Sequence, residues 1–202
     1  MSDLMLDVGQ AVELKEAFRR GGYNNAEIKQ LSTGDTLAQV RDVLRGLCEI
    51  KPVEHAVDLG VDPFLPDGWK VEEHQNGKVV KLERKGSDLY LDGKKIDFYL
   101  SKKQKGGSIE GNDLRKELTK MPVLNANMLD YLLKNPLIIP DEWKTDGDGN
   151  TRCLFFWGTV YRNADGSLCV RYLVWNGGRW GSNYGWLGVD WRSNNPAAVS
   201  AS

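Results

Sequence analysis

The chain has 202 residues, of which 41% are hydrophobic and 27% are charged, and its formal net charge is −1. This composition is that of a folded globular protein, and the near-neutral charge gives no general attraction to nucleic acid or to an anionic membrane. No apolar run is long enough to span a bilayer, and the start, MSDLMLDVGQAVELKE, carries acids where a signal peptide needs a basic head and an apolar core. We therefore expect no membrane span and a cytoplasmic protein, with later export or surface display left open.

Residues 1–55 predict a small helical N-terminal module. Apolar residues recur at helical spacing from Val8 to Phe18, and Gly21-Gly22 ends that run. Asn24 or Asn25 can cap a second short helix, and Thr36 to Leu47 predicts a third. Arginines on these helices are accompanied by acidic residues that cancel their field, which favours docking or oligomerisation over nucleic-acid binding.

Residues 52–66 predict a domain boundary, and after them the apolar residues change from helical spacing to the alternation of strands. Pro52 to Pro66 contains three prolines and is the expected connector, so that the second domain covers 62–202. From Trp69 to Leu100 apolar and polar residues alternate around Asn76-Gly77 and Asp92-Gly93. Such turns between alternating runs predict a meander of about three or four antiparallel strands.

Two helices are expected after this meander. The lysine-rich stretch 102–107 is expected to be a solvated loop. Asn112 to Leu118 and Ala126 to Leu133 have helical patterns, and Asn125 can cap the second helix, which should end before Pro136. The succession of strands, helices and further strands predicts the α+β class.

Residues 153–202 concentrate five of the seven tryptophans among glycine, serine and asparagine. Residues 153–161 and 167–175 are rich in aromatic and β-branched residues and flank Asp165-Gly166, which predicts a β-hairpin. From Asn176 to Pro196 the tryptophans are spaced by five, six and five residues, which fits neither the helical nor the strand period. This stretch is therefore expected to be a long loop region held by large aromatic side chains, and ordered loops of that length are usually functional.

At this point the sequence resembles a known family. The motifs are the run FFWGTVYRNADGSLCVRYLVW, then GGRW, YGWL and DW, the C-terminal NPAAVSAS, and upstream LNANMLDYLL and IPDEW. Together they resemble the C-terminal region of variable proteins of diversity-generating retroelements, which occur in bacteria, their phages and archaeal systems. The resemblance covers about the last 80 residues and implies a C-type lectin-like fold. It also implies exposed residues that are altered by adenine-specific mutagenesis on a fixed scaffold.

The resemblance places the variable region at about 174–196 and implies a non-catalytic, receptor-type protein that binds a protein or glycan ligand through a diversified surface. Every residue other than tryptophan between 176 and 195 can be reached from an asparagine codon by changing its adenines. The expected ligand-binding residues are Asn176, Gly177, Gly178, Gly181, Ser182, Asn183, Tyr184, Gly185, Gly188, Val189, Asp190, Arg192, Ser193 and Asn194. Tryptophans can fix such loops or contact ligand, and the expected scaffold consists of Trp157, Trp175, Trp180, Trp186 and Trp191.

The chain lacks complete sequence patterns for catalysis or metal binding. Residues 146–150, DGDGN, begin like a calcium loop, but Thr151 and Trp157 stand where that loop needs glycine and glutamate. The two histidines, His55 and His74, have no nucleophile motif beside them. We therefore expect no metal, no cofactor and no catalytic residue.

Two alternatives to the family reading stay open. The first is a carbohydrate- or cell-wall-binding module that uses exposed tryptophans. The second, less favoured, is an enzyme of the formylglycine-generating type, which would need cysteine chemistry. Cys153 and Cys169 are instead expected to be buried free thiols on packed strands.

Overall fold

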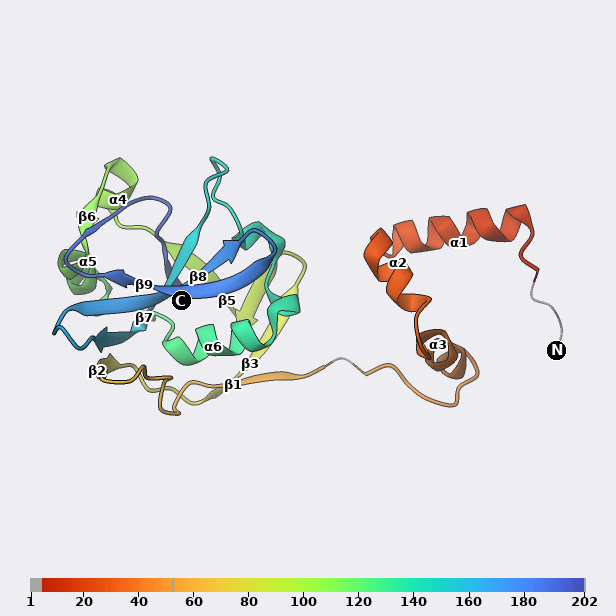
Figure 1. The fold of residues 1–202 in the computed structure, drawn as a ribbon, viewed down its shortest axis with the longest axis horizontal. Coiled ribbons are helices and arrows are strands. Elements are labelled where there is room, and N and C mark those ends of the chain that lie inside the picture. Colours follow the sequence, from red (N-terminus) through yellow and green to blue (C-terminus); the bar gives the residue numbers. More distant parts are fainter. Residues whose placement is uncertain (1–4, 52, 202) are drawn as a thin grey trace. The chain divides into compact units, whose positions relative to one another are not determined.

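The computed structural model describes residues 5–51 and 53–201. The chain divides into two compact units, Met1–Val53 and Glu54–Ser202 (Figure 1). The expected connector therefore contributes to the second unit, because His55–Asp58 forms a paired strand of its sheet. Residues 1–4, 52 and 202, which belong to the expected domains, lie outside the described residues.

The first unit consists of the three helices that the sequence predicts, α1 (Val8–Arg20), α2 (Asn25–Leu31) and α3 (Thr36–Leu44). Asp7 and Asn24 cap the first two helices through reciprocal capping boxes, which satisfy backbone N–H groups that a helix start leaves free. No residue of these three helices is buried in the structure. Nor is any helix within residues 5–51 and 53–201 long and apolar enough to cross a bilayer.

The second unit is of the α+β class, as predicted. In chain order its elements are β1 (His55–Asp58), β2 (Lys70–His74), β3 (Val79–Lys85), β4 (Asp88–Leu91), β5 (Lys94–Tyr99), α4 (Lys102–Gly106), β6 (Ile109–Glu110), α5 (Gly111–Leu118), α6 (Ala126–Lys134), the 3-10 helices Pro136–Ile138 and Asp141–Trp143, β7 (Cys153–Arg162), β8 (Leu168–Asn176), β9 (Arg179–Trp186), β10 (Asp190–Trp191) and β11 (Ala197–Ser200).

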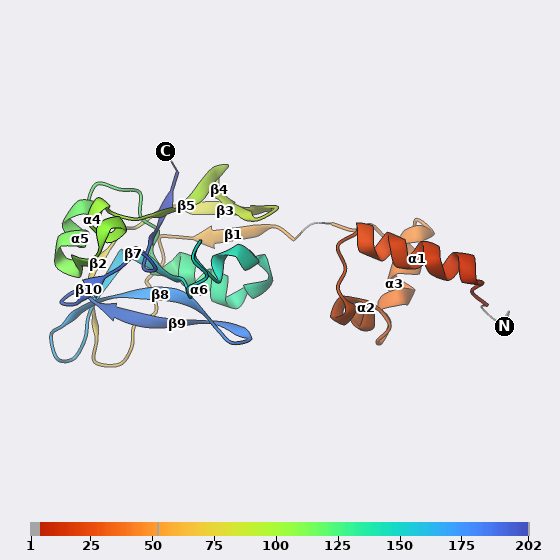
Figure 2. The same ribbon diagram turned by 90° about the horizontal axis from the view of Figure 1, so that it is seen from above.

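One large sheet has the strand order β1-β3-β4-β5-β11-β7-β8-β9, with β2 paired to β7, while β10 and β6 form a separate pair. The last strand, β11, lies between β5, to which it is antiparallel, and β7, to which it is parallel. The sheet bends around α6, so that β1, β3, β4 and β5 lie on one side of this helix and β8 and β9 on the other (Figure 2).

Burial of α6 between the two halves of the sheet forms the main core. Met128, Leu129 and Leu132 are fully buried, and they pack in one cluster with Leu89 of β4 and Phe156 of β7. Each fully buried side chain of this size contributes about 1.5–3 kcal/mol to folding. The helix therefore joins the two halves of the sheet into one folded unit.

The predicted meander is partly confirmed. Strands β3, β4 and β5 pair in succession, and β4 and β5 are joined by Asp92-Gly93, whose φ angles of 47° and 80° suit a tight hairpin turn. The prediction of a hairpin at Asn76-Gly77 is wrong, because neither residue has a positive φ and β2 pairs with β7 instead. Gly77 donates its N–H to the Leu59 carbonyl, which turns the chain toward β1.

The lysine-rich stretch forms a short helix, α4, where a loop is expected. Ser101 and Gln104 make a reciprocal capping box at its start, with both residues buried. The S-x-x-Q spacing is a sequence signal for such a start, but the surrounding lysines and glycines obscure it. Lys102, Lys103 and Lys105 are exposed, as expected.

The start of α6 is a close junction between the helix, β7 and two distant loops. The side chain of Asn125 accepts a hydrogen bond from the Met128 N–H, and its amide group donates to the carbonyls of Leu59 (2.8 Å) and Gln75 (3.0 Å). Gly158 of β7 packs directly against Asn125, because a Cβ at residue 158 would lie 2.8 Å from the Asn125 backbone nitrogen. Only glycine allows β7 this close to the helix.

We predict that Gly158→Ala destabilises the second unit. The added methyl group meets backbone atoms that cannot move independently, so we expect a loss of about 1–3 kcal/mol in the free energy of unfolding. The matched control is Gly147→Ala, where a Cβ meets no atom within 4 Å and φ is not positive. Thermal melts of both variants decide the point, and equal melting temperatures would contradict this account of the junction.

Candidate ligand-binding face

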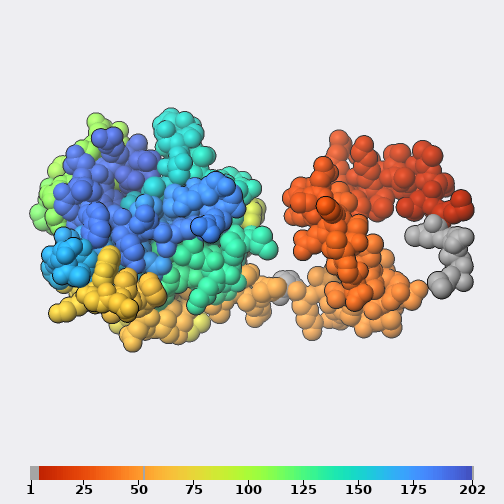
Figure 3. Space-filling model, in the orientation of Figure 1, coloured from red at the N-terminus to blue at the C-terminus, as the bar shows by residue number. Residues whose placement is uncertain are grey.

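The fourteen expected ligand-binding residues lie in one continuous stretch, residues 176–194, which we call the display segment. It begins at the tip of the β8–β9 hairpin, follows β9, and continues through a loop toward β11. In the space-filling view, the blue C-terminal strands and loops occupy a broad area of the visible surface (Figure 3). Gly177 and Gly178 form the hairpin turn with φ angles of 50° and 132°, between the paired residues Asn176 and Arg179.

The expectation of an irregular loop is wrong for the first half of the segment. Arg179–Trp186 forms the strand β9, which pairs with β8 over eight successive residues. One face of the strand carries the side chains of Trp180, Tyr184 and Trp186, because these residues are separated by even numbers of positions. The strand period of two residues becomes clear only when Tyr184 is considered together with the tryptophans.

The second half of the segment is held through its backbone by residues outside it. The Leu187 N–H donates to the Leu168 carbonyl (2.9 Å), and the Leu187 carbonyl accepts from the Asn112 N–H (3.0 Å). The Val189 carbonyl accepts from the Gly111 N–H (3.1 Å) at the start of α5. These bonds use main-chain atoms of the loop, so they do not depend on its side chains.

Gln104 fixes the next turn of the loop. Its side chain is 1% exposed, and its amide group donates to the carbonyls of Arg192 (3.2 Å) and Asn195 (3.0 Å). Gln104 lies outside the residues expected to form the site, because it is 88 positions away from Arg192 in the chain. The loop then joins the sheet, where Cys153 donates its N–H to the Asn194 carbonyl (2.9 Å).

Trp157 and Trp191 form the buried floor beneath the loop, with exposed fractions of 4% and 2%. Their ring centroids are 4.7 Å apart, and Phe155 packs on Trp191 at 4.1 Å. The indole N–H of Trp191 donates to the Trp186 carbonyl (3.2 Å), so the ring also anchors the end of β9. Burial of this kind is what the expected scaffold role requires of these two tryptophans.

The other three tryptophans of the expected scaffold are less buried. Trp175 and Trp180 face each other across the hairpin in an edge-to-face pair with centroids 5.3 Å apart, and both are half-buried. Trp186, also an expected scaffold residue, is 38% exposed and so differs from the buried Trp157 and Trp191. It lies at the end of β9 near Trp69, a residue outside the segment that packs 4.7 Å from Tyr184.

None of the fourteen expected ligand-binding residues is buried. Ten are exposed, and Gly181, Tyr184, Gly185 and Asn194 are half-buried. The buried residues Leu187 and Trp191 separate the exposed ones along the loop. The segment thus alternates between buried residues that fix its course and exposed residues that face solvent.

The structure corrects the expectation of a variable residue at Gly185. A Cβ at this position would lie 2.6 Å from Phe155 and 3.0 Å from Trp191, so glycine is required by packing. Gly178 is restricted by its φ of 132°, whereas the φ of 50° at Gly177 also suits asparagine and aspartate. Gly188 has neither restriction, because a Cβ there meets nothing within 4 Å.

The polar layer beneath β9 contains one ion pair and two phenols. Arg171 of β8 is 5% exposed, forms an ion pair with Asp130 of α6 at 2.8 Å, and donates to the Ser182 hydroxyl at 3.3 Å. Burial raises the pKa of Tyr161 to about 12 and also raises the pKa of Tyr184. Both phenols therefore stay protonated at neutral pH beside the ion pair.

Hollows open on three parts of the second unit. One of about 400 Å³ lies beside the hairpin tip and is lined in part by Trp175, Gly178, Arg179 and Trp180. Lys144 lies over the Trp175 ring, 4.0 Å from its centroid, and covers one face of it. Another hollow, of about 510 Å³, lies between the segment that follows β1 and helix α6.

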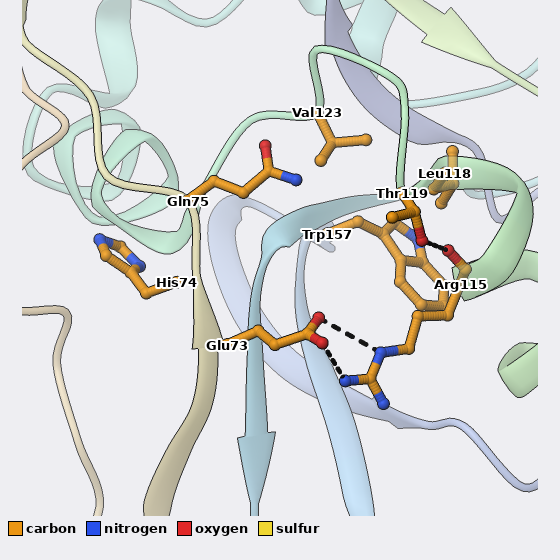
Figure 4. Close-up of a pocket in the computed structure, with 8 residues that line it drawn as sticks. All are labelled: Glu73, His74, Gln75, Arg115, Leu118, Thr119, Val123 and Trp157. Carbon is orange, nitrogen blue, oxygen red and sulfur yellow. Dashed lines mark hydrogen bonds and ion pairs between the residues drawn. The ribbon is translucent and has the colours of Figure 1, made fainter.

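The third hollow, of about 450 Å³, lies between β2, β7 and α5 (Figure 4). Glu73 and Arg115 form an ion pair at its side, and the ring of His74 points away from the centre. The Nδ1 of His74 lies 2.8 Å from the Thr159 hydroxyl, and burial lowers the pKa of this histidine. Trp157, one of the expected scaffold residues, lines this hollow.

Metal and thiol chemistry have little support in the described residues. Residues 5–51 and 53–201 contain no group of three or more His, Cys, Asp or Glu side chains placed to hold a metal ion. Asp146 of the calcium-like loop accepts hydrogen bonds from the N–H groups of Asp148 and Asn150, which closes a turn. Burial raises the pKa of the Cys153 thiol and raises that of Cys169 to about 12, which opposes thiolate formation.

Comparison with protein-family models, with curated proteins and with solved structures finds no match to this chain.

We predict that exposed positions of the display segment tolerate joint substitution. Replacing Gly188, Val189, Asp190 and Arg192 together by residues reachable from asparagine codons should change the free energy of unfolding by no more than about 0.5 kcal/mol at each site. Gly185→Ser should instead cost about 1–3 kcal/mol by overpacking against Phe155. Gly188→Ser is the matched control, and thermal melts measure all three. A multiple variant that unfolds while Gly185→Ser survives would show that the segment is a fixed core.

We predict that the buried thiol makes stability fall at high pH. Because the pKa of Cys169 is raised to about 12 from the ordinary value of 9.0, the unfolded state loses its proton first as the pH rises above about 9. The free energy of unfolding should therefore decrease between about pH 9 and pH 12, and Cys169→Ala should reduce this slope. At pH 8 a thiol reagent should modify the exposed Cys48 in the native protein and Cys169 only after unfolding. Native modification of Cys169 would contradict the assignment.

Proposed function

We propose that this chain is a non-catalytic ligand-binding protein that displays a diversified surface on a C-type lectin-like scaffold, as a variable protein of a diversity-generating retroelement does. The observation that carries the proposal is the way in which the loop after β9 is held. Main-chain bonds from Leu168, Asn112, Gly111 and Cys153, and the side chain of Gln104, fix its backbone. Its exposed side chains are then free to change without altering its course.

The composition of the exposed positions supports a binding role. Serine, asparagine, glycine and tyrosine provide adaptable hydrogen bonding and rigid aromatic area, as they do in antibody loops. The rigid floor of Trp157 and Trp191 lies outside the exposed set and needs no change between variants. A diversified surface requires this division between a fixed floor and variable contacts.

The order of elements is compatible with the lectin-like scaffold. Strands come first, two helices α5 and α6 follow, and the β7–β8 hairpin leads into the display segment. Strand β11 then returns to lie between β5 and β7, which places the C-terminal strand inside the sheet. The sequence resemblance, rather than this order alone, selects the C-type lectin-like fold.

A carbohydrate-binding module is the second candidate, and the hollow at the hairpin tip favours it. Trp175, Trp180 and Arg179 line that hollow together with Lys144 and Asp141, and sugar sites combine aromatic rings with such polar groups. The position of Lys144 over Trp175 opposes it, because a stacked sugar needs a free ring face. The raised thiol pKa values at Cys153 and Cys169 oppose the formylglycine-generating alternative.

The encoding DNA tests the proposal most directly. We predict a reverse transcriptase gene near the coding sequence and a second copy of the 3′ region that differs from it at adenines. The differences should fall on codons for exposed positions such as Val189 and Arg192 and spare Trp157, Gly185 and Trp191, because changes there disturb packing. Sequencing the genomic region checks this, and differences spread evenly over buried and exposed codons would contradict it.

A glycan array checks the second candidate. Should a sugar bind the full chain, and should Trp180→Ala or Trp186→Ala abolish that binding without changing the melting temperature, the carbohydrate function would replace the proposed one. Val189→Ala, on the loop rather than near the hollow, is the control that should leave sugar binding unchanged.

A further inference from the structure

The outer edge of β9 is an unpaired sheet edge. The strand order ends at β9, and within the described residues this strand pairs with β8 alone. Figure 2 shows β9 as the outermost of the three strands β7, β8 and β9. Its eight residues pair with β8 in one unbroken register, so its other edge is correspondingly straight.

The register shows which backbone groups face outward. The Leu187 N–H donates to Leu168, which marks this opposed pair as hydrogen-bonded. In an antiparallel pair, hydrogen-bonded and non-hydrogen-bonded positions alternate. Gly181, Asn183 and Gly185 therefore direct their N–H and C=O groups toward β8. The outward groups belong to Trp180, Ser182, Tyr184 and Trp186.

Side-chain contacts agree with this assignment. The Tyr184 N–H donates to the Asn183 side-chain oxygen (2.8 Å), and the Trp186 carbonyl accepts from the Trp191 indole (3.2 Å). These contacts occupy two outward groups. Among residues 5–51 and 53–201, no hydrogen bond is formed to the outward N–H and C=O groups of Trp180 and Ser182.

This edge lacks the protection that natural sheet edges usually have. Edge strands are commonly blocked by charged residues, prolines or bulges, which prevent unwanted pairing. β9 contains one charged residue, Arg179 at its start, and no proline or bulge. In contrast, β2 carries Lys70, Glu72 and Glu73 and has a register shift in its pairing with β7.

We propose that β9 binds an extended segment of the target protein by strand addition. A row of alternating N–H and C=O groups is matched by another polypeptide backbone, which supplies the complementary row at the same spacing. The choice of a target segment over a second copy of this chain rests on the proposed function. Pairing β9 with itself would bury positions 181–184, which that function requires to contact ligand.

Strand addition gives affinity that does not depend on the diversified side chains. Main-chain hydrogen bonds hold the target segment, while side chains at alternate positions select its sequence. The small residues Gly181, Ser182 and Gly185 leave the edge accessible. Asn183 covers the Tyr184 N–H, so substitution at this expected variable position adjusts how much of the edge is free.

The test uses Ser182→Pro and Ser182→Ala in the full chain. Proline removes the outward N–H of residue 182 and leaves the bonds to β8 intact, and proline is tolerated at an edge position whose N–H faces solvent. Alanine removes the side chain and keeps the N–H. The probe is a phage-displayed library of linear random nonapeptides selected on the wild-type chain, and affinities of synthetic selected peptides are measured by calorimetry.

We expect selected peptides to bind Ser182→Pro at least about tenfold more weakly than Ser182→Ala, because both variants lack the hydroxyl and only alanine keeps the outward N–H; tenfold corresponds to about 1.4 kcal/mol. Melting temperatures confirm that both variants are folded. Asn183→Ala provides a second measurement, because it uncovers the Tyr184 N–H. It should tighten peptide binding about threefold, and unchanged or weaker binding would contradict the proposal even if Ser182→Pro failed to fold.

Three outcomes would overturn the proposal. The first is a folded Ser182→Pro variant that binds the peptides as tightly as the wild type. The second is a library that yields no peptide binder. The third is a dimer in sedimentation that Ser182→Pro dissociates, since a second copy would then occupy the edge. In each case, a second copy of the 3′ region that differs from the coding sequence at adenines would still support the proposed function. Failure of strand addition can therefore be distinguished from failure of the proposed function.

Discussion

The fold of the second unit depends on the contact between Asn125 and Gly158 at the start of α6. One asparagine side chain caps the helix and holds two distant carbonyls, those of Leu59 and Gln75. The absence of a side chain at residue 158 lets β7 reach the same point. Because buried amide groups are costly to leave unpaired, these contacts act together and fix the helix against both halves of the sheet. This junction also fixes the position of β7 and β8, which carry the display segment.

The display segment is held in the same manner, through groups that do not vary. Backbone atoms of its loop are bound by α5, β7 and β8, and its two buried residues, Leu187 and Trp191, pack inward. Substitution of an exposed side chain of this loop therefore leaves these backbone–backbone bonds and the core in place. Gly185 shows the limit of this freedom, since it lies on the strand yet touches Phe155 and Trp191. Exposure to solvent alone does not make a position variable; the space above its Cα must also be free.

Local signals predicted much of this structure from the sequence. The Asp165-Gly166 hairpin and the Asn125 cap depend on neighbours within a few residues, and both are present. The features that the sequence did not predict depend on contacts between residues far apart in the chain. Asn76-Gly77 does not form a hairpin because β2 pairs with β7, about 90 residues away. Gln104 becomes part of the site through the Arg192 carbonyl, a contact that no spacing in the sequence indicates.

The glycine content of the display segment links the two ways in which it can contact a partner. Glycine and serine at positions 181, 182 and 185 offer little side-chain area, so a surface of this composition gains little from apolar burial. The same small residues leave the backbone of β9 accessible along its edge. Larger side chains at positions 181 and 182 would add contact area while narrowing access to that edge. We therefore expect variants with larger residues on this face to bind more through side-chain contacts and less through main-chain pairing. The floor of Trp157 and Trp191 would be the same in all of them.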